Sequence, residues 1–180
     1  PKPPASSTGH TQPGRSPKYG YNAPEKCGTS VWAIGDSEIA SAVEAAHDAA
    51  ITSVIDWIER EAAWTRTGRN GVNHERVEGL IVSRWQHRTS RSGDPQLHTH
   101  CAVLNKGRIE GDGKWRALDG QAIYASSAVG NARYLATLET ELTDRLGVEW
   151  SVPTGAAREI VGIPAELRSL WSKRAADIAS

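Results

Sequence analysis

Two strand-like segments separated by a turn signal constrain the fold of this sequence most strongly. Residues 77–87 are rich in β-branched side chains, and residues 97–105 alternate apolar with polar ones. The Ser-Gly-Asp-Pro run at 92–95 is typical of a turn, so we expect an antiparallel pair. Because His98 and His100 are two residues apart on the second strand, their side chains should leave the same face.

Three other segments carry apolar residues at helical spacing, with start or stop signals at their ends. They are residues 36–63, which Asp36 or Ser37 can cap, 121–146, which Gly147 can end, and the segment from Pro164 to Ala175. Short strands are expected at 31–34 and, after an Asp-Gly hairpin turn, at 114–117. The predicted class is α+β, a two-layer sandwich of an antiparallel sheet with helices on one face.

Composition sets the domain boundaries and excludes several classes of protein. Residues 1–26 are dominated by Pro, Ser, Gly and Lys, so we expect a disordered lead-in there and one folded domain at 27–180. No apolar run approaches the roughly 20 residues of a membrane helix. Cys27 and Cys101 provide no disulfide framework, and a cytoplasmic location is expected. The chain starts at Pro1 and has no Met, which fits either a processed start or an excised fragment.

Three histidines are candidates for a metal site. His87 ends the first strand of the pair, and the turn can bring it beside His98 and His100. Three imidazoles from adjacent strands would leave coordination positions open for water or substrate, and by ligand softness they favour Zn²⁺, Ni²⁺ or Mn²⁺. For His98 and His100 alone, surface histidines on a polar strand edge are an equally good interpretation; the third histidine favours the metal site.

The zero net charge hides a basic stretch. Seven arginines stand against three glutamates (61, 75 and 78) between residues 60 and 91, an excess of 7 − 3 = 4. The arginines are at 60, 66, 69, 76, 84, 88 and 91. Arg88 and Arg91 flank His87, where they could grip a phosphate or simply be solvated. Trp64 and Trp85 lie in the same stretch; indoles can stack on unpaired bases, although for Trp64 a place in the core is favoured.

These residues together resemble the signature of the TrwC/TraI-type conjugative relaxases, the MobF class. The matching positions are His87, Ser90, Arg91, Asp94, Pro95, Gln96, Leu97, His98, Thr99, His100 and Asn105. Outside the signature, Thr65-Arg66 with Gly68 and Gly71 resembles the basic loop of that family. The run from Trp115 to Gly120 resembles its W-R-A-L-D-G segment.

The resemblance implies a fold and an activity. The fold would be an HUH-like palm, with the histidines in the floor of the sheet. His87, His98 and His100 would bind a divalent cation, Mg²⁺ or Mn²⁺, that polarises the scissile phosphate of single-stranded DNA at a transfer origin. In the family a tyrosine attacks this phosphate and leaves a 5′-phosphotyrosine link. The predicted DNA-binding residues are Arg66, Arg69, Arg88 and Arg91, and Asp94 and Asn105 are expected to support the metal ligands from behind.

The sequence departs from the family where the nucleophile should be. Nothing corresponds to the tyrosines near the amino terminus of the family, and its catalytic aspartate would fall at about Lys18. We therefore assign no catalytic residue and expect a catalytically incomplete relaxase, either a fragment or a truncated gene product, that is inactive alone. Tyr19 or Tyr21 as a substitute nucleophile is the minor alternative.

Two functions other than that of a relaxase also fit part of the sequence. One is a non-catalytic single-stranded DNA-binding module with the same fold. The other is an unrelated His-x-His metalloenzyme such as a cupin-like barrel, against which stand the long helices and the lack of a Glu soon after His100. The sequence leaves the oligomeric state open.

Overall fold

A long helix, α2 (Ser37–Glu61), forms the backbone of the fold in the computed structural model, which describes residues 18–21, 26–153 and 158–170. The carboxylate of Asp36 caps it, accepting hydrogen bonds from the backbone N–H groups of Glu38 (3.0 Å) and Ile39 (2.9 Å). Its apolar stripe is buried at three- and four-residue steps. The buried residues are Val43, Ala46, His47, Ala50, Ile51, Val54 and Ile58. The helix predicted at 36–63 is confirmed.

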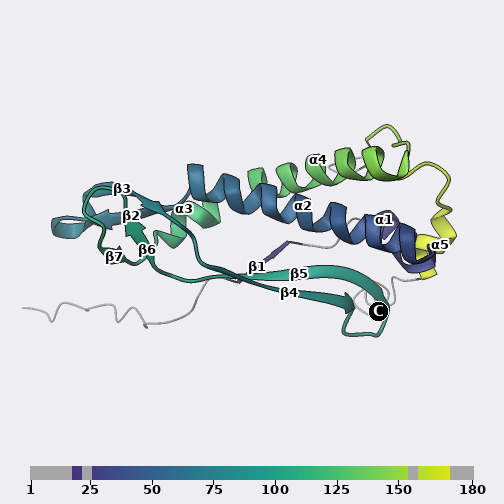
Figure 1. Ribbon diagram of the computed structural model, residues 1–180, viewed down its shortest axis with the longest axis horizontal. Helices are drawn as coiled ribbons and strands as arrows, with labels where there is room; N and C mark the ends of the chain where they lie inside the picture. Colours follow the sequence, from purple (N-terminus) through teal and green to yellow (C-terminus); the bar gives the residue numbers. More distant parts are fainter. Residues whose placement is uncertain (1–17, 22–25, 154–157, 171–180) are drawn as a thin grey trace, which may run out of the picture.

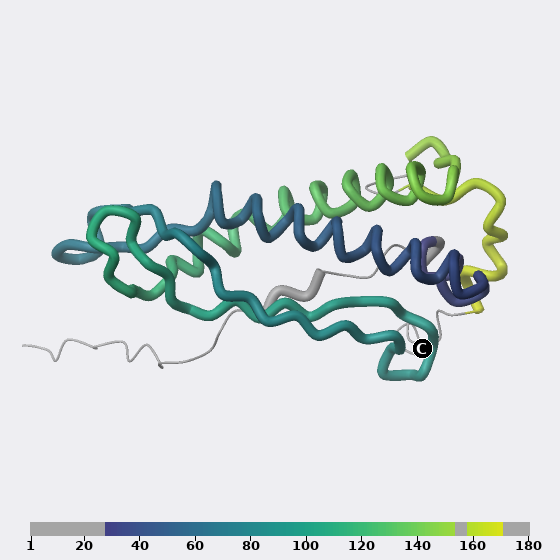
Figure 2. Tube along the Cα trace, in the orientation of Figure 1, coloured from purple at the N-terminus to yellow at the C-terminus, as the bar shows by residue number. Residues whose placement is uncertain are grey.

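A second long helix packs along α2. This helix, α4 (Ser127–Leu146), buries Gly130, Tyr134, Leu138 and Leu142. The two helices run side by side (Figures 1 and 2). Gly147, in the left-handed conformation with φ 64°, ends α4 as predicted. The single helix predicted at 121–146 is wrong in one respect. Ser126 separates α4 from α3 (Gly120–Ala125). The hydroxyl of Ser126 donates to the carbonyl of Ile123, and such a bond from a side chain to the backbone competes with the regular helical pattern.

The strands form two antiparallel sheets. A three-stranded sheet has the order β1-β5-β4, and a four-stranded sheet has the order β2-β3-β6-β7. Their bounds are β1 (Lys18–Tyr21), β2 (Trp64–Thr67), β3 (Asn73–Glu78), β4 (Val82–Thr89), β5 (Pro95–Val103), β6 (Gly107–Ile109) and β7 (Trp115–Arg116). The single strand predicted at 77–87 breaks at Gly79, whose φ of 71° ends β3 and lets β4 start in the other sheet. The antiparallel β4–β5 pair is as predicted.

Helices cover one face of the β1-β5-β4 sheet. Along β5, Leu97, Thr99, Cys101 and Val103 are buried, whereas His98, His100 and Ala102 between them are half-buried or exposed. Figure 1 shows α2 and α4 on one side of β4 and β5, and none of the helices that the structure describes lies on the other side. The predicted α+β class, with helices on one face of an antiparallel sheet, is confirmed.

The strand predicted at 31–34 is wrong, because these residues belong to a helix, α1 (Lys26–Ile34). Short apolar runs are ambiguous between strand and helix, and packing on α2 decides. The indole N–H of Trp32 donates to Glu44 of α2 (3.0 Å). Gly35 then lets the chain turn tightly into α2, since a Cβ there would overlap the side chain of Ile39.

The two ends of the chain extend beyond the described residues. The predicted lead-in at 1–26 contains β1 and the first residue of α1, because β5 offers a backbone edge with which Lys18–Tyr21 pairs; its remaining residues lie outside the described part. The predicted third helix is observed as α5 (Ala165–Leu170), and its continuation to Ala175 is also outside. None of the described helices is both long and apolar enough to cross a bilayer.

Candidate metal and DNA site

The turn between β4 and β5 sets the register of the candidate site. Its backbone is closed by two hydrogen bonds: Ser90 N donates to the carbonyl of Asp94 (2.8 Å), and Asp94 N donates to the hydroxyl of Ser90 (3.1 Å). The strands then pair with His87 opposite His98 and with Trp85 opposite His100. Directly opposite residues of an antiparallel pair share a face, so the turn places all three histidines on the face without helices.

The three imidazole rings form a nearly regular triangle. Every pair of ring centroids is 5.1 Å apart; His87 and His98 are close to parallel at 18°, and His100 is nearly perpendicular to both. His87 and His100 are exposed and His98 is half-buried. Nδ1 of His98 lies 3.0 Å from the carbonyl oxygen of Gln96. An Nδ1–H donated to that carbonyl leaves Nε2 with a free lone pair on the open face.

The distances between the three rings fit one shared metal ion, but the orientations of the rings do not. With metal–nitrogen bonds of about 2.1 Å, three imidazoles around one ion have centroids roughly 5 Å apart. Within the part of the chain that the structure describes, however, no group of three His, Cys, Asp or Glu side chains could hold a metal ion as it stands. The lone pairs of the stacked His87 and His98 lie in nearly parallel planes, so at least one ring must turn before both nitrogens reach one ion. The exposed rings of His87 and His100 can rotate readily, whereas the strand register that sets the spacing is fixed.

On the opposite face of β5, a buried hydrogen-bond network reaches Thr99, the residue between His98 and His100. His47 of α2 is fully buried; its Nδ1 lies 2.7 Å from the hydroxyl of Tyr134 in α4, and its Nε2 lies 2.9 Å from the hydroxyl of Thr99. Burial lowers the pKa of His47 to about 4, with a smaller contribution from His98. Burial likewise raises the pKa of Tyr134. His47 is therefore neutral, one ring nitrogen donating and the other accepting, and ties both helices to the strand between His98 and His100.

The sequence alone predicts a structural or solvated role for His47 and does not connect it with the site. Its position within the apolar stripe of α2 is the available signal, but no sequence pattern pairs it with Thr99, 52 residues away. His74 lies exposed on β3, in the other sheet.

The four predicted DNA-binding arginines lie in different places. Arg88 points to the helix side, where it pairs with Glu44 of α2 (3.0 Å). Arg91 is exposed in the β4–β5 turn. Arg66 and Arg69 belong to the β2–β3 hairpin, at the other end of the molecule from that turn (Figure 1). Arg66 pairs with Asp119 (2.7 Å), whose pKa is lowered, since the bond from this guanidinium and backbone N–H groups outweigh the upward effect of burial. Of the four, Arg91 is therefore the one that is exposed in the turn between the histidine strands and has no ion pair among the described residues.

Asp94 and Asn105, the two residues expected to support the metal ligands, also differ in where the structure places them. Asp94 is buried in the turn beneath Ser90, four residues from His98. Asn105 follows the end of β5, five residues beyond His100, roughly 16 Å away at the rise of an extended strand. Only Asp94 is placed where it can stabilise the histidine turn.

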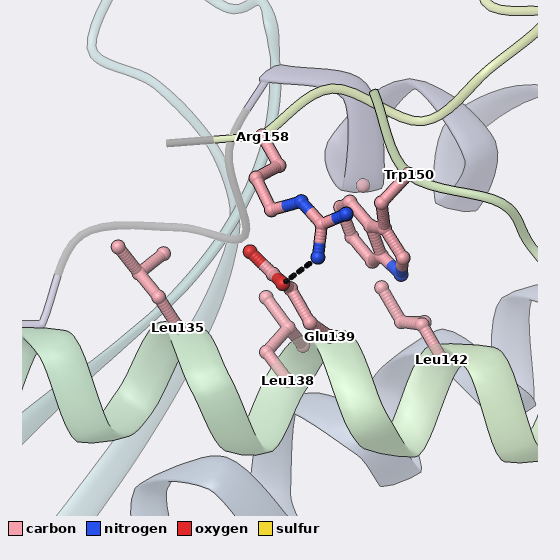
Figure 3. Close-up of a pocket in the computed structure, with 7 residues that line it drawn as sticks. Leu135, Leu138, Glu139, Leu142, Trp150 and Arg158 are labelled. Carbon is pink, nitrogen blue, oxygen red and sulfur yellow. Dashed lines mark hydrogen bonds and ion pairs between the residues drawn. The ribbon is translucent and has the colours of Figure 1, made fainter. Parts of the chain in front are cut away.

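A pocket lies elsewhere in the molecule, between α1, α4 and the side chains of Trp150 and Arg158. It is lined mainly by apolar side chains, and the ion pair of Arg158 with Glu139 (3.3 Å) spans it (Figure 3). None of its lining residues belongs to β4 or β5. The candidate site is therefore separate from this pocket.

Comparisons with known proteins agree with this geometry. The family model described as TrwC relaxase matches residues 19–180. The multifunctional conjugation protein TraI of Escherichia coli is 26% identical, over 83% of this chain and 10% of its own length. The structure of conjugative relaxase TrwC in complex with oriT DNA, metal-bound, is 31% identical with a TM-score of 0.78, over 90% of this chain and 54% of TrwC. TrwC complexed with a 27-mer DNA comprising the recognition hairpin and the cleavage site is 30% identical with a TM-score of 0.75. The chain thus spans about a tenth of TraI and about half of the TrwC structures.

Proposed function

The chain belongs to the TrwC relaxase family, and on that premise we propose that it is the metal-binding portion of a conjugative relaxase acting on single-stranded DNA at a transfer origin. The supporting observation is the triangle of three imidazoles, with centroids 5.1 Å apart, on the helix-free face of the sheet. An open face admits an extended strand of DNA, which a closed pocket would not. TrwC, the relative in the solved complexes, binds oriT DNA.

In this proposal His87, His98 and His100 hold a divalent cation. Such an ion, when bound, polarises a phosphate oxygen and stabilises the charge that develops on it. Three imidazoles leave the remaining coordination positions of the ion open for water or a phosphate oxygen. The family resemblance favours Mg²⁺ or Mn²⁺, and the donor set also suits Zn²⁺ or Ni²⁺. Structures of TrwC include metal-bound, copper-bound and metal-free forms.

Calorimetric titration of the full chain with Mn²⁺ and with Mg²⁺ tests the metal site. The double substitution His98→Ala/His100→Ala should abolish binding, because one imidazole cannot hold the ion alone. His74→Ala is the matched control, since His74 is an exposed strand histidine in the other sheet, and it should bind like the wild type. Equal binding by the double variant would refute the proposed ligands.

The DNA half of the proposal predicts binding that depends on salt. Each arginine that contacts a phosphate of a single strand contributes about 0.7 to the slope of log affinity against log salt concentration. Arg69 and Arg91 are exposed, and within the described residues neither forms an ion pair. Arg66 and Arg88 would have to exchange a carboxylate for a phosphate. We expect Arg91→Ala to lower the affinity for a single-stranded origin oligonucleotide and to reduce this slope.

Arg145→Ala is the control for Arg91→Ala, because Arg145 is exposed at the end of α4 and pairs with Glu141. It should leave both affinity and slope unchanged. If all four variants (Arg66→Ala, Arg69→Ala, Arg88→Ala and Arg91→Ala) bind like the wild type, the proposed phosphate contacts are wrong. DNA binding that needs neither metal nor histidines would favour the non-catalytic binding module instead.

We expect no covalent DNA adduct from this chain alone. No residue of it matches the nucleophilic tyrosines of the family, and Lys18 occupies the approximate position of the catalytic aspartate. Incubation with an origin oligonucleotide and Mn²⁺, followed by denaturing electrophoresis, is the measurement. An adduct that disappears in Tyr19→Phe/Tyr21→Phe would overturn this expectation and identify a substitute nucleophile.

A further inference from the structure

Trp85 is a large aromatic side chain on the open face of the sheet. It lies on β4 directly opposite His100 and two residues before His87, so by strand alternation it shares the face of the three histidines. Its side chain is 53% exposed. Singly exposed apolar side chains are common on protein surfaces, so what distinguishes this indole is its position beside the three histidines.

Three other tryptophans, Trp32, Trp64 and Trp150, have hydrogen-bond partners within the protein. The indole N–H groups of Trp32, Trp64 and Trp150 donate to Glu44, to the carbonyl of Glu61 and to Thr143. Arg76 also lies over the ring of Trp64. Among the described residues, Trp85 makes neither a ring contact nor a hydrogen bond through its indole. The ring of Trp85 is therefore free to accept an external partner on its face.

The charge around Trp85 indicates the nature of that partner. Neither β4 nor β5 contains an Asp or a Glu. The two arginines that flank Trp85 most closely on β4, Arg84 and Arg88, lie on the helix side and are paired with Asp48 and Glu44 of α2. The open face thus combines imidazoles with an indole and has no strand carboxylate to repel an anion. A chain of phosphates with planar bases fits this combination, because it offers both charge and π faces.

We propose that Trp85 is a base-stacking site, on which one nucleobase of single-stranded DNA lies beside the phosphate held at the histidines. The inference rests on the proposed function, to which it adds the contact that holds the base. Stacking does not discriminate strongly between bases, because every base has a π face. Trp85 would therefore fix the position of a nucleotide at the metal site without specifying its sequence.

Fluorescence anisotropy with a labelled single-stranded origin oligonucleotide measures the effect. Stacking on one aromatic ring is worth about 5- to 150-fold in affinity, so Trp85→Ala should weaken binding at least 5-fold. Trp85→Phe keeps a smaller π face and should restore most of the affinity. Trp115→Ala is a closely matched control: Trp115 is also 53% exposed, on strand β7 of the other sheet, and its removal should change nothing.

A set of oligonucleotides, each lacking one base, locates the contact. For the wild type, one abasic position should weaken binding about as much as Trp85→Ala does, and in the Trp85→Ala chain that position should cost nothing further. Wild-type affinity in Trp85→Ala, equal losses in Trp85→Ala and Trp115→Ala, or additive losses at every abasic position would each overturn the stacking site.

Mn²⁺ binding distinguishes failure of the stacking site from failure of the proposed function. Trp85→Ala should bind Mn²⁺ as the wild type does in a titration without DNA. Normal Mn²⁺ and DNA binding that is insensitive to Trp85 would refute the stacking site and leave the proposed function intact. No DNA binding by the wild-type chain would refute both.

Discussion

The two faces of the β4–β5 strand pair carry different kinds of side chain. On the helix side, Leu97 and Cys101 are buried, and Arg84 and Arg88 are paired with carboxylates of α2. On the open side, the three histidines and Trp85 face solvent without a nearby strand carboxylate. Because side chains alternate along a strand, neighbours such as Thr99 and His100 act on opposite faces. Residues that stabilise the fold therefore alternate with the proposed binding residues along the same nine-residue strand.

The largest expected effect tests this division directly. Leu97 is fully buried on the helix side, and Leu97→Ala should lower the free energy of unfolding by about 2–5 kcal/mol through lost burial and a cavity. Urea unfolding is the measurement. Trp85→Ala on the open face should cost no more than about 0.5 kcal/mol. Comparable losses in the two variants would break the division into a stabilising and a binding face.

The buried imidazole should make stability depend on pH. The pKa of His47 is about 4 in the folded chain against 6.5 for a free imidazole. As the pH falls below 6.5, His47 is protonated in the unfolded chain but stays neutral in the native chain. The contribution of His47 to the free energy of unfolding is therefore complete above pH 6.5 and is lost between pH 6.5 and 4. The total is on the order of 3 kcal/mol.

Urea unfolding at pH 7, 6 and 5 measures this dependence. His47→Gln should be less stable at pH 7 and should show a flatter decline, because the group that titrates is gone. His74→Ala, with an exposed histidine, keeps the wild-type decline as the control. A decline in His47→Gln as steep as in the wild type would assign the pH dependence to other groups.

A smaller effect is expected at the far end of the network. Tyr134→Phe removes the hydroxyl that bonds Nδ1 of His47 and leaves that buried nitrogen unsatisfied, which costs about 1–3 kcal/mol. The exposed Tyr124→Phe is the control and should be neutral. If the network also positions β5, Tyr134→Phe should weaken Mn²⁺ binding, whereas an unchanged Mn²⁺ affinity would restrict the network to stability.

The smallest effect concerns Arg88. Its ion pair with Glu44 lies at the surface, where such pairs contribute about 0–1 kcal/mol, so Arg88→Gln should barely change urea unfolding. If Arg88 contacts DNA and does not stabilise the fold, the same substitution lowers the affinity for single-stranded DNA and makes that affinity less dependent on salt. A stability loss above about 1 kcal/mol with unchanged DNA affinity would place Arg88 wholly on the helix side.

Much of the framework could be predicted from local sequence signals. The cap at Asp36, the stripe of α2, the end of α4 at Gly147 and the β4–β5 turn depend on residues within one element. The spacing of His98 and His100 fixed their shared face. The errors arose where local signals were ambiguous: residues 31–34 became part of α1 because Trp32 packs on α2, and Ser126 divided the expected second helix.

Which histidines can meet follows from local rules, because a strand repeats every two residues and a turn of fixed length sets the register. What lies behind and beside these histidines depends on tertiary packing. His47 reaches Thr99 from α2, Arg88 turns to Glu44, and Arg66 lies at the far end of the molecule from His87. The physical reason is that these relations depend on how helices pack on a sheet. That packing is settled by burial over the whole core and not by any short pattern along the chain.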